Sequence, residues 1–97
     1  MPALLISYHI EDASTGRRAL DVDREARRAY GAGREYLYQG VADPTDILVL
    51  VEWDGDDRAR LYACSDDLLD LLRRAGSTGP HWVWVLADDG TSTLVHG

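Results

Sequence analysis

The segment Ile47–Trp53, with sequence ILVLVEW, constrains the fold more than any other part of the chain. As a strand it would present apolar side chains on both faces, because successive side chains alternate. One face would carry Ile47, Val49, Val51 and Trp53, and the other Leu48 and Leu50. Neither face can lie in water, yet a chain of 97 residues has too few helices to cover both faces of a sheet. The second face therefore requires another chain or a ligand, which predicts a dimer with a small-molecule pocket.

The hydropathy pattern predicts one domain spanning residues 1–97, with the order strand, helix, strand, strand, helix, strand. The strands are expected at residues 4–10, 34–39, 47–53 and 81–86, and the helical segments at 17–30, 54–64 and 66–75. Right-handed crossovers would place the helices on one face of a four-stranded antiparallel sheet. This is a ferredoxin-like βαββαβ fold of the α+β class. Residues 91–97 are expected to form a polar tail.

The first helix is expected to present a set of apolar residues at helical spacing to the core, with arginines on the other side. These residues are Leu20, Val22, Ala26, Ala29 and Tyr30. The start of this helix stays open, because Ser14, Thr15 and Asp21 could each cap it. Ser65 is the expected cap of the last helical segment.

Charge and cysteine content exclude several classes of function. The net charge is −7, and all ten cationic side chains are arginines, with no basic stripe for nucleic acid. The absence of lysine removes Schiff-base chemistry, and the single cysteine, Cys64, excludes an internal disulfide and is expected to be a small core residue. No apolar segment approaches the length of a membrane span, and the N-terminus has no basic signal-peptide region. A cytoplasmic location without membrane contact is therefore expected.

The second half of the chain carries several motifs in a fixed order. They are the Tyr36–Tyr38 strand, Asp43-Pro44, Glu52-Trp53-Asp54, the Ala59…Leu68 helical region, and Ala75-Gly76…Gly79-Pro80. In these features residues 34–86 resemble the dimeric α/β-barrel superfamily, which includes antibiotic biosynthesis monooxygenases and small polyketide cyclases. The resemblance implies a homodimer that pairs the bare sheet faces, with a pocket in each subunit between sheet and helices.

Two departures from that family narrow the expected chemistry. Cofactor-free oxygenases of this kind often use an Asn together with a Trp near the end of the third strand. Trp53 fits the second role, but the chain contains no Asn. Haem-degrading relatives need a His on the second helix, and the region around Tyr62–Cys64 has none. These departures favour cyclisation over oxygenation and predict that neither haem nor any other cofactor is required.

Histidines and aromatic residues are the candidates for a site. His9 and His81 are the candidate catalytic residues, because a neutral imidazole can act as a general base or acid near pH 7. His96 lies in the tail and is expected to be inert. No compact metal-ligand spacing occurs among the three histidines, so no metal site is predicted. The candidate substrate-binding residues are Tyr8, Tyr36, Tyr38, Trp53, Trp82 and Trp84, which could equally belong to the core or a dimer interface.

The lone charge in the apolar strand, Glu52, is a candidate base if it is buried, or a partner of Arg34 across the hairpin. We expect Trp53, with Tyr36 or Tyr38 and one of the two candidate histidines, to line one cavity between sheet and helices.

Together these features predict a cofactor-independent enzyme that cyclises an aromatic, polyketide-like substrate by proton transfer. The alternatives are a cofactor-free monooxygenase and a non-catalytic dimeric protein that binds a small molecule.

Overall fold

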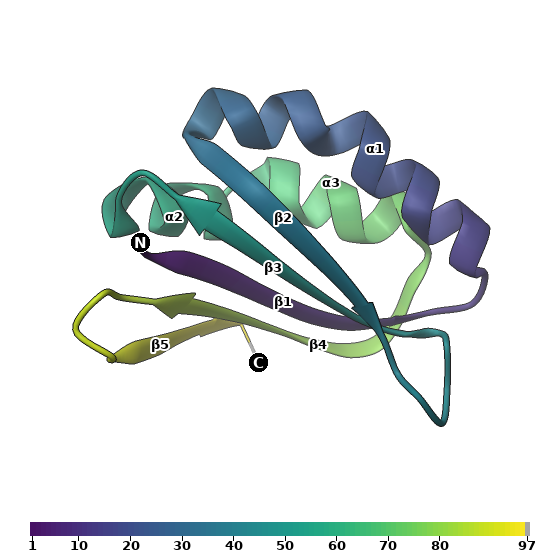
Figure 1. The fold of residues 1–97 in the computed structure, drawn as a ribbon. Helices are drawn as coiled ribbons and strands as arrows, with labels where there is room; N and C mark the ends of the chain where they lie inside the picture. Colours follow the sequence, from purple (N-terminus) through teal and green to yellow (C-terminus); the bar gives the residue numbers. More distant parts are fainter. Residues whose placement is uncertain (97) are drawn as a thin grey trace.

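The computed structural model describes residues 1–96, which form five strands and three helices (Figure 1). In chain order the elements are β1 (Ala3–Ile10), α1 (Ala13–Tyr30), β2 (Ala32–Gln39), β3 (Asp46–Trp53), α2 (Asp56–Ala63), α3 (Asp66–Arg74), β4 (Ser77–Leu86) and β5 (Ser92–His96). The sheet order is β2-β3-β1-β4-β5, and every neighbouring pair is antiparallel. The helices lie together on one side of the sheet (Figure 1). The ferredoxin-like α+β fold and the β2–β3 hairpin are thus confirmed.

The sheet has two chemically different faces, because side chains alternate along each strand. The covered face, beneath the helices, holds the buried side chains of the central strands. These are Leu4, Ile6, Tyr8 and Ile10 of β1, Ile47, Val49, Val51 and Trp53 of β3, and Val83 and Val85 of β4. The open face has no helix over it. It carries Leu5, Ser7 and His9 of β1, Tyr36 and Tyr38 of β2, Leu48, Leu50 and Glu52 of β3, Trp82 and Trp84 of β4, and Leu94 of β5.

The C-terminal segment differs from the prediction of a polar tail. Residues Ser92–His96 form β5, an edge strand that pairs with β4, while Gly97 lies outside the described residues. Val95 packs against the core and anchors the strand. A five-residue strand with so few apolar positions gives no clear alternation, which is why the sequence pattern missed it. The sheet therefore has five strands rather than four.

Helix α1 begins earlier than predicted, and its buried stripe differs. Asp12 caps the helix by accepting a hydrogen bond from the backbone N–H of Ser14 (3.3 Å). Its carboxylate also accepts from the hydroxyls of Thr15 (2.7 Å) and Ser14 (2.9 Å), and these bonds hold the pKa of the Asp12 carboxyl below its usual range. The predicted core residue Val22 is 60% exposed. The buried residues are instead Gly16, Ala19, Leu20, Asp23 and Arg27. The prediction was wrong because it treated every charged residue as exposed, whereas here an acidic and a basic residue are buried together.

The second helical region agrees with the prediction of two segments, α2 and α3. The Ser65 hydroxyl accepts a hydrogen bond from the backbone N–H of Leu68 (3.3 Å) and caps α3, as expected. Acidic side chains lie in the first turn of α3 and basic ones in the last, which complements the helix dipole. No helix among residues 1–96 has the length and apolar character needed to cross a membrane.

Candidate functional site

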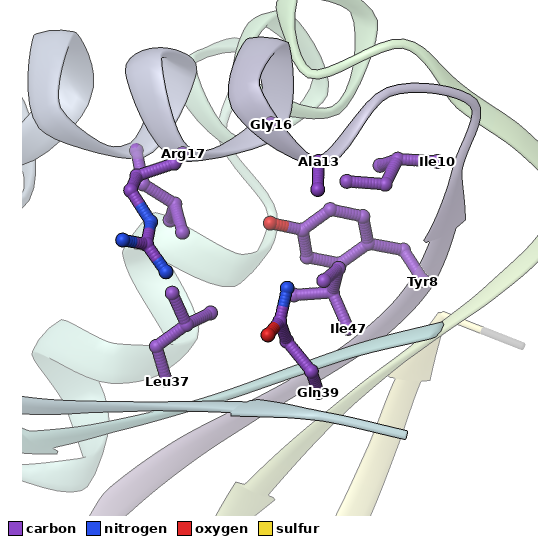
Figure 2. A pocket seen from close by; sticks show the side chains of 9 residues that line it. Tyr8, Ile10, Ala13, Gly16, Arg17, Leu37, Gln39 and Ile47 are labelled. Atoms are coloured by element: carbon purple, nitrogen blue, oxygen red, sulfur yellow. The ribbon is translucent and has the colours of Figure 1, made fainter. Parts of the chain in front are cut away.

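A small cavity lies on the covered face, between the N-terminal half of α1 and the strands β1, β2 and β3 (Figure 2). Its volume is about 10 Å³, which is about the space that one water molecule needs. The lining residues are Tyr8, Ile10, Ala13, Gly16, Arg17, Leu20, Leu37, Gln39 and Ile47. The walls are mainly apolar, with three polar side chains that come from three different elements.

The most distinctive group in this cavity is the Tyr8 hydroxyl. It is buried and has no hydrogen-bond partner among the described residues. Figure 2 shows the Tyr8 ring beneath α1, with its oxygen directed toward the space between Arg17 and Gln39. Burial raises the pKa of Tyr8 to about 12, so the phenol stays protonated at neutral pH. A water molecule fits this cavity and can accept the Tyr8 hydrogen bond, and a ligand oxygen that replaces the water would accept the same bond.

A wider groove continues from the cavity along α1 and the edge strand β2. Its volume is about 120 Å³, and it shares Arg17, Leu20 and Leu37 with the cavity. The mouth is bordered by Arg24 of α1 and Glu35 of β2. We call the cavity and the groove together the α1–β2 cleft. The cleft therefore combines an apolar floor, a buried hydroxyl and arginines at the surface.

A buried ion-pair network fixes the end of this cleft. Arg27 of α1 is fully buried and donates hydrogen bonds to Asp23 (2.9 Å), to Glu35 of β2 (2.9 Å) and to the carbonyl of Leu20 (3.0 Å). The Tyr62 hydroxyl of α2 donates to Asp23 (2.7 Å). The network thus ties α1 to β2 and to α2. Because each arginine nitrogen has a partner within the protein, Arg27 acts as a structural tie and not as a free ligand group.

Gly16 allows α1 to approach β1 closely above the cavity. A Cβ atom at this position would lie 2.5 Å from the Cδ1 atom of Ile10. A larger residue would displace Ile10 and with it the wall of the cavity. The sequence analysis missed Gly16, Arg17 and Gln39 as site residues. Gly16 gave no signal, because the sequence pattern starts the helix at residue 17 and leaves Gly16 in the preceding turn.

The expected common cavity of Trp53, Tyr36 or Tyr38, and a histidine does not form. Trp53 is fully buried in the core, where its ring lies 5.5 Å from that of Tyr62. Tyr36 and Tyr38 pair with Leu50 and Leu48 and so belong to the open face. Tyr36 borders the groove at the edge of the sheet, but its hydroxyl donates to Glu52 on the open face (3.1 Å). The expectation failed because the sequence could not tell which face the helices cover.

The two candidate catalytic histidines lie apart from the cleft and from each other. His9 is on the open face, where its Nδ1 atom is 2.8 Å from a carboxylate oxygen of Asp46. His81 lies in a separate open groove of about 400 Å³ with Gly79, Pro80 and His96. Burial, and then the neighbouring His96, lower the pKa of His81. Neither imidazole lines the α1–β2 cleft.

The other predicted residues are also distributed over both faces. Trp82, which is 41% exposed, and Trp84 lie on the open face, so only Tyr8 and Trp53 among the six candidate aromatics lie on the covered face. His96, expected to be inert, bonds through Nε2 to the carbonyl of Ala63 (2.8 Å). Cys64, expected in the core, is exposed at the end of α2 because the chain turns there toward α3. Glu52 bonds to Tyr36 rather than to Arg34.

Comparison with solved structures supports the fold assignment. A protein from Bordetella bronchiseptica, provisionally named an antibiotic biosynthesis monooxygenase, matches with a TM-score of 0.72 at 15% identity, over 90% of this chain and 95% of that one. A protein from Nitrosomonas europaea with the same provisional name gives 0.65 at 14% identity, over 90% and 97%. Rv0793 from Mycobacterium tuberculosis gives 0.62 at 22% identity, over 90% and 94%. Neither the protein-family models nor the curated proteins give a match. At these identities the likeness shows a shared ferredoxin-like α+β fold.

Proposed function

We propose that this protein is a cofactor-independent enzyme that cyclises an aromatic, polyketide-like substrate in the α1–β2 cleft. The observation that carries the proposal is the buried Tyr8 hydroxyl, which has no partner among residues 1–96 and faces a small apolar cavity next to Arg17 and Gln39. Proteins of similar fold are provisionally named antibiotic biosynthesis monooxygenases, which supports a role in related metabolism rather than the cyclisation itself.

In the proposed reaction the cleft stabilises negative charge on a substrate oxygen. Ring closure of a polyketide starts with the loss of an acidic α-proton to water, which later returns a proton to Tyr8. The enolate carbon then adds to a carbonyl, and the carbonyl oxygen becomes an alkoxide. The protonated Tyr8 hydroxyl would donate a hydrogen bond and then a proton to that oxygen, while the Arg17 guanidinium stabilises the developing charge. This assigns Tyr8 the role of hydrogen-bond and proton donor, because a phenol carries its proton at neutral pH.

Substrate entry requires the side chains over the cleft to move, because the Arg27 network ties α1 to β2. The cavity and the groove are each smaller than the roughly 300–1,000 Å³ typical of small-molecule sites. The cover over the cleft consists of the exposed side chains of Arg17, Arg24 and Gln39, which can rotate away without breaking the core. The buried Arg27 network would then hold the far end of the cleft in place.

The open face supports the proposed homodimer. It presents the partly buried side chains of Leu48, Leu50 and Trp84. Tyr38 and Leu94 lie on the same face and are 52% and 45% exposed. A continuous surface of this composition is typical of protein interfaces and is an aggregation hazard if left bare. A second copy of the same chain would cover it, because both copies present the same apolar surface.

A non-catalytic binding protein is the second candidate. The small size of the cleft and the location of His9 and His81 outside it favour this alternative. A cofactor-free monooxygenase is the third, and the burial of Trp53 in the core does not favour it.

The test compares Tyr8→Phe with Tyr38→Phe in a cyclisation assay on linear aromatic polyketide intermediates. Loss of an oxyanion donor costs about a hundredfold or more in turnover, so Tyr8→Phe should show that loss. Tyr38→Phe makes the same chemical change on the open face and should retain activity. If the wild-type protein binds these compounds without converting them, the binding-protein alternative holds. Equal activity of Tyr8→Phe and wild type would refute the role of Tyr8.

A further inference from the structure

A second cluster of polar side chains lies away from the cleft, where β1 ends and β3 begins. We propose that His9, Asp43 and Asp46 bind a divalent transition-metal ion such as Zn²⁺. One ligand atom from each residue can be chosen so that all three atoms lie within 4.8 Å of one another. The sequence pattern predicted no metal site, because its histidines show no compact ligand spacing and His9 is distant in sequence from the two aspartates.

The separations between these atoms fit a single ion. His9 Nδ1 lies 2.8 Å from Asp46 Oδ1 and 3.9 Å from Asp43 Oδ2. Ligand atoms about 2.1 Å from a tetrahedral ion are about 3.4 Å apart, which lies between the two observed values. Rotation of the partly exposed side chains would bring the His9 nitrogen and one oxygen of each aspartate toward this separation.

The backbone around the cluster is held in place before any ion binds. The Asp43 Oδ1 atom accepts hydrogen bonds from the backbone N–H (3.0 Å) and the hydroxyl (2.5 Å) of Thr45, which leaves Oδ2 for the ion. The backbone N–H of Asp46 donates to the Asp43 carbonyl (3.1 Å), and that of Gly40 donates to the Asp46 carbonyl (2.9 Å). A Cβ atom at Gly40 would lie 2.6 Å from the Asp43 carbonyl oxygen, so this turn needs glycine.

The charge and the donor types select the class of ion. His9 is the only basic side chain within 4.0 Å of either aspartate in the described part of the chain. With a neutral imidazole the cluster carries two negative charges, which a dication would balance. One imidazole nitrogen and two carboxylate oxygens suit Zn²⁺, Mn²⁺ or Co²⁺, whereas Mg²⁺ and Ca²⁺ prefer oxygen ligands alone. Side-chain exposures of 42% for His9 and 64% for Asp46 leave room for water as a further ligand.

Titration of the metal-free protein with Zn²⁺ by calorimetry, and with Co²⁺ by visible absorption, tests the site. We expect one equivalent to bind with a micromolar dissociation constant. His9→Gln and Asp46→Asn should each weaken binding at least about tenfold. Both residues are exposed, and circular dichroism would confirm that the variants remain folded. Mg²⁺ should compete at least about a hundredfold less well than Zn²⁺.

His81→Gln is the matched control, because His81 lies apart from the proposed site, beside His96, with ring centroids 5.6 Å apart. This variant should bind Zn²⁺ as wild type does. Three results would overturn the proposal: no saturable binding up to about 1 mM Zn²⁺, unchanged binding in both His9→Gln and Asp46→Asn, or loss of binding in His81→Gln.

Discussion

The covered and open faces of the sheet are built from the same strands but serve different purposes. On the covered face, the side chains of β1 and β3 are buried beneath the helices, and a small cavity lies at Tyr8. On the open face, aromatic and aliphatic side chains such as Tyr38 and Trp82 remain partly exposed. The comparison shows that an abundance of aromatic residues does not by itself locate a ligand site. The face on which each residue lies decides whether it is core, site or interface.

The two faces should differ most in their contribution to stability. Trp53→Ala removes a fully buried side chain of the covered face and should lower the free energy of unfolding by about 3–5 kcal/mol. Trp82→Ala on the open face, where the side chain is 41% exposed, should cost less than about 1 kcal/mol. Urea denaturation at low protein concentration measures both. Equal losses would contradict the assignment of faces.

The buried ion pairs of α1 provide a sharper test of the covered face. Arg27→Met would leave Asp23 and Glu35 without their buried partner and should cost about 3 kcal/mol or more. Arg24→Met removes an arginine from the same helix that is 45% exposed, and should cost less than about 1 kcal/mol. Thermal and chemical unfolding would compare the two variants. A mild effect of Arg27→Met would show that the network does not hold the cleft together.

The open face should control association rather than folding. Leu50→Asp places a charge in the middle of this face and should weaken the proposed homodimer by about a hundredfold or more. The control is Leu69→Asp, at a position of α3 that is 47% exposed, and it should not affect association. Sedimentation equilibrium gives the dissociation constants. A monomeric wild-type protein at micromolar concentration would remove the basis for the dimer.

The smallest expected effect is a loss of stability at alkaline pH. The pKa of Tyr8 is about 12 in the folded protein and about 10 in an unfolded chain. Between these two pKa values Tyr8 keeps its proton in the folded state but has lost it in the unfolded state. The free energy of unfolding therefore falls as pH rises from about 10 to 12. Carbon NMR of the tyrosine Cζ atoms should show the late titration of Tyr8. In Tyr8→Phe the alkaline loss of stability should be smaller.

The sequence predicted the architecture well because that depends on strong patterns. Alternation in β1 and β3, and the glycine that ends α1, were sufficient for the ferredoxin-like order. The short strand β5 was not predicted, because Val95 alone packs against the core and one apolar residue gives no alternating pattern. The buried face of α1 was predicted wrongly, because Asp23 and Arg27 form an ion pair in the interior. The helical spacing of apolar residues does not reveal such a buried pair.

The candidate site could be predicted only in part. Tyr8 was named as a binding residue, but its cavity partners Arg17 and Gln39 come from other elements and show no common motif. Their proximity depends on how closely α1 lies over β2. The aromatic residues of the open face were grouped with Trp53 because a strand pattern defines two faces without saying which one is covered.

The central claim is that small molecules bind on the covered face, in the α1–β2 cleft. Amide chemical-shift mapping during titration with a tricyclic hydroxyanthrone tests it most directly. We expect the largest shifts at Tyr8, Gly16, Arg17 and Gln39, and their loss in Tyr8→Phe. Shifts confined to Tyr38, Trp82 and Trp84 would place binding on the open face and contradict the account.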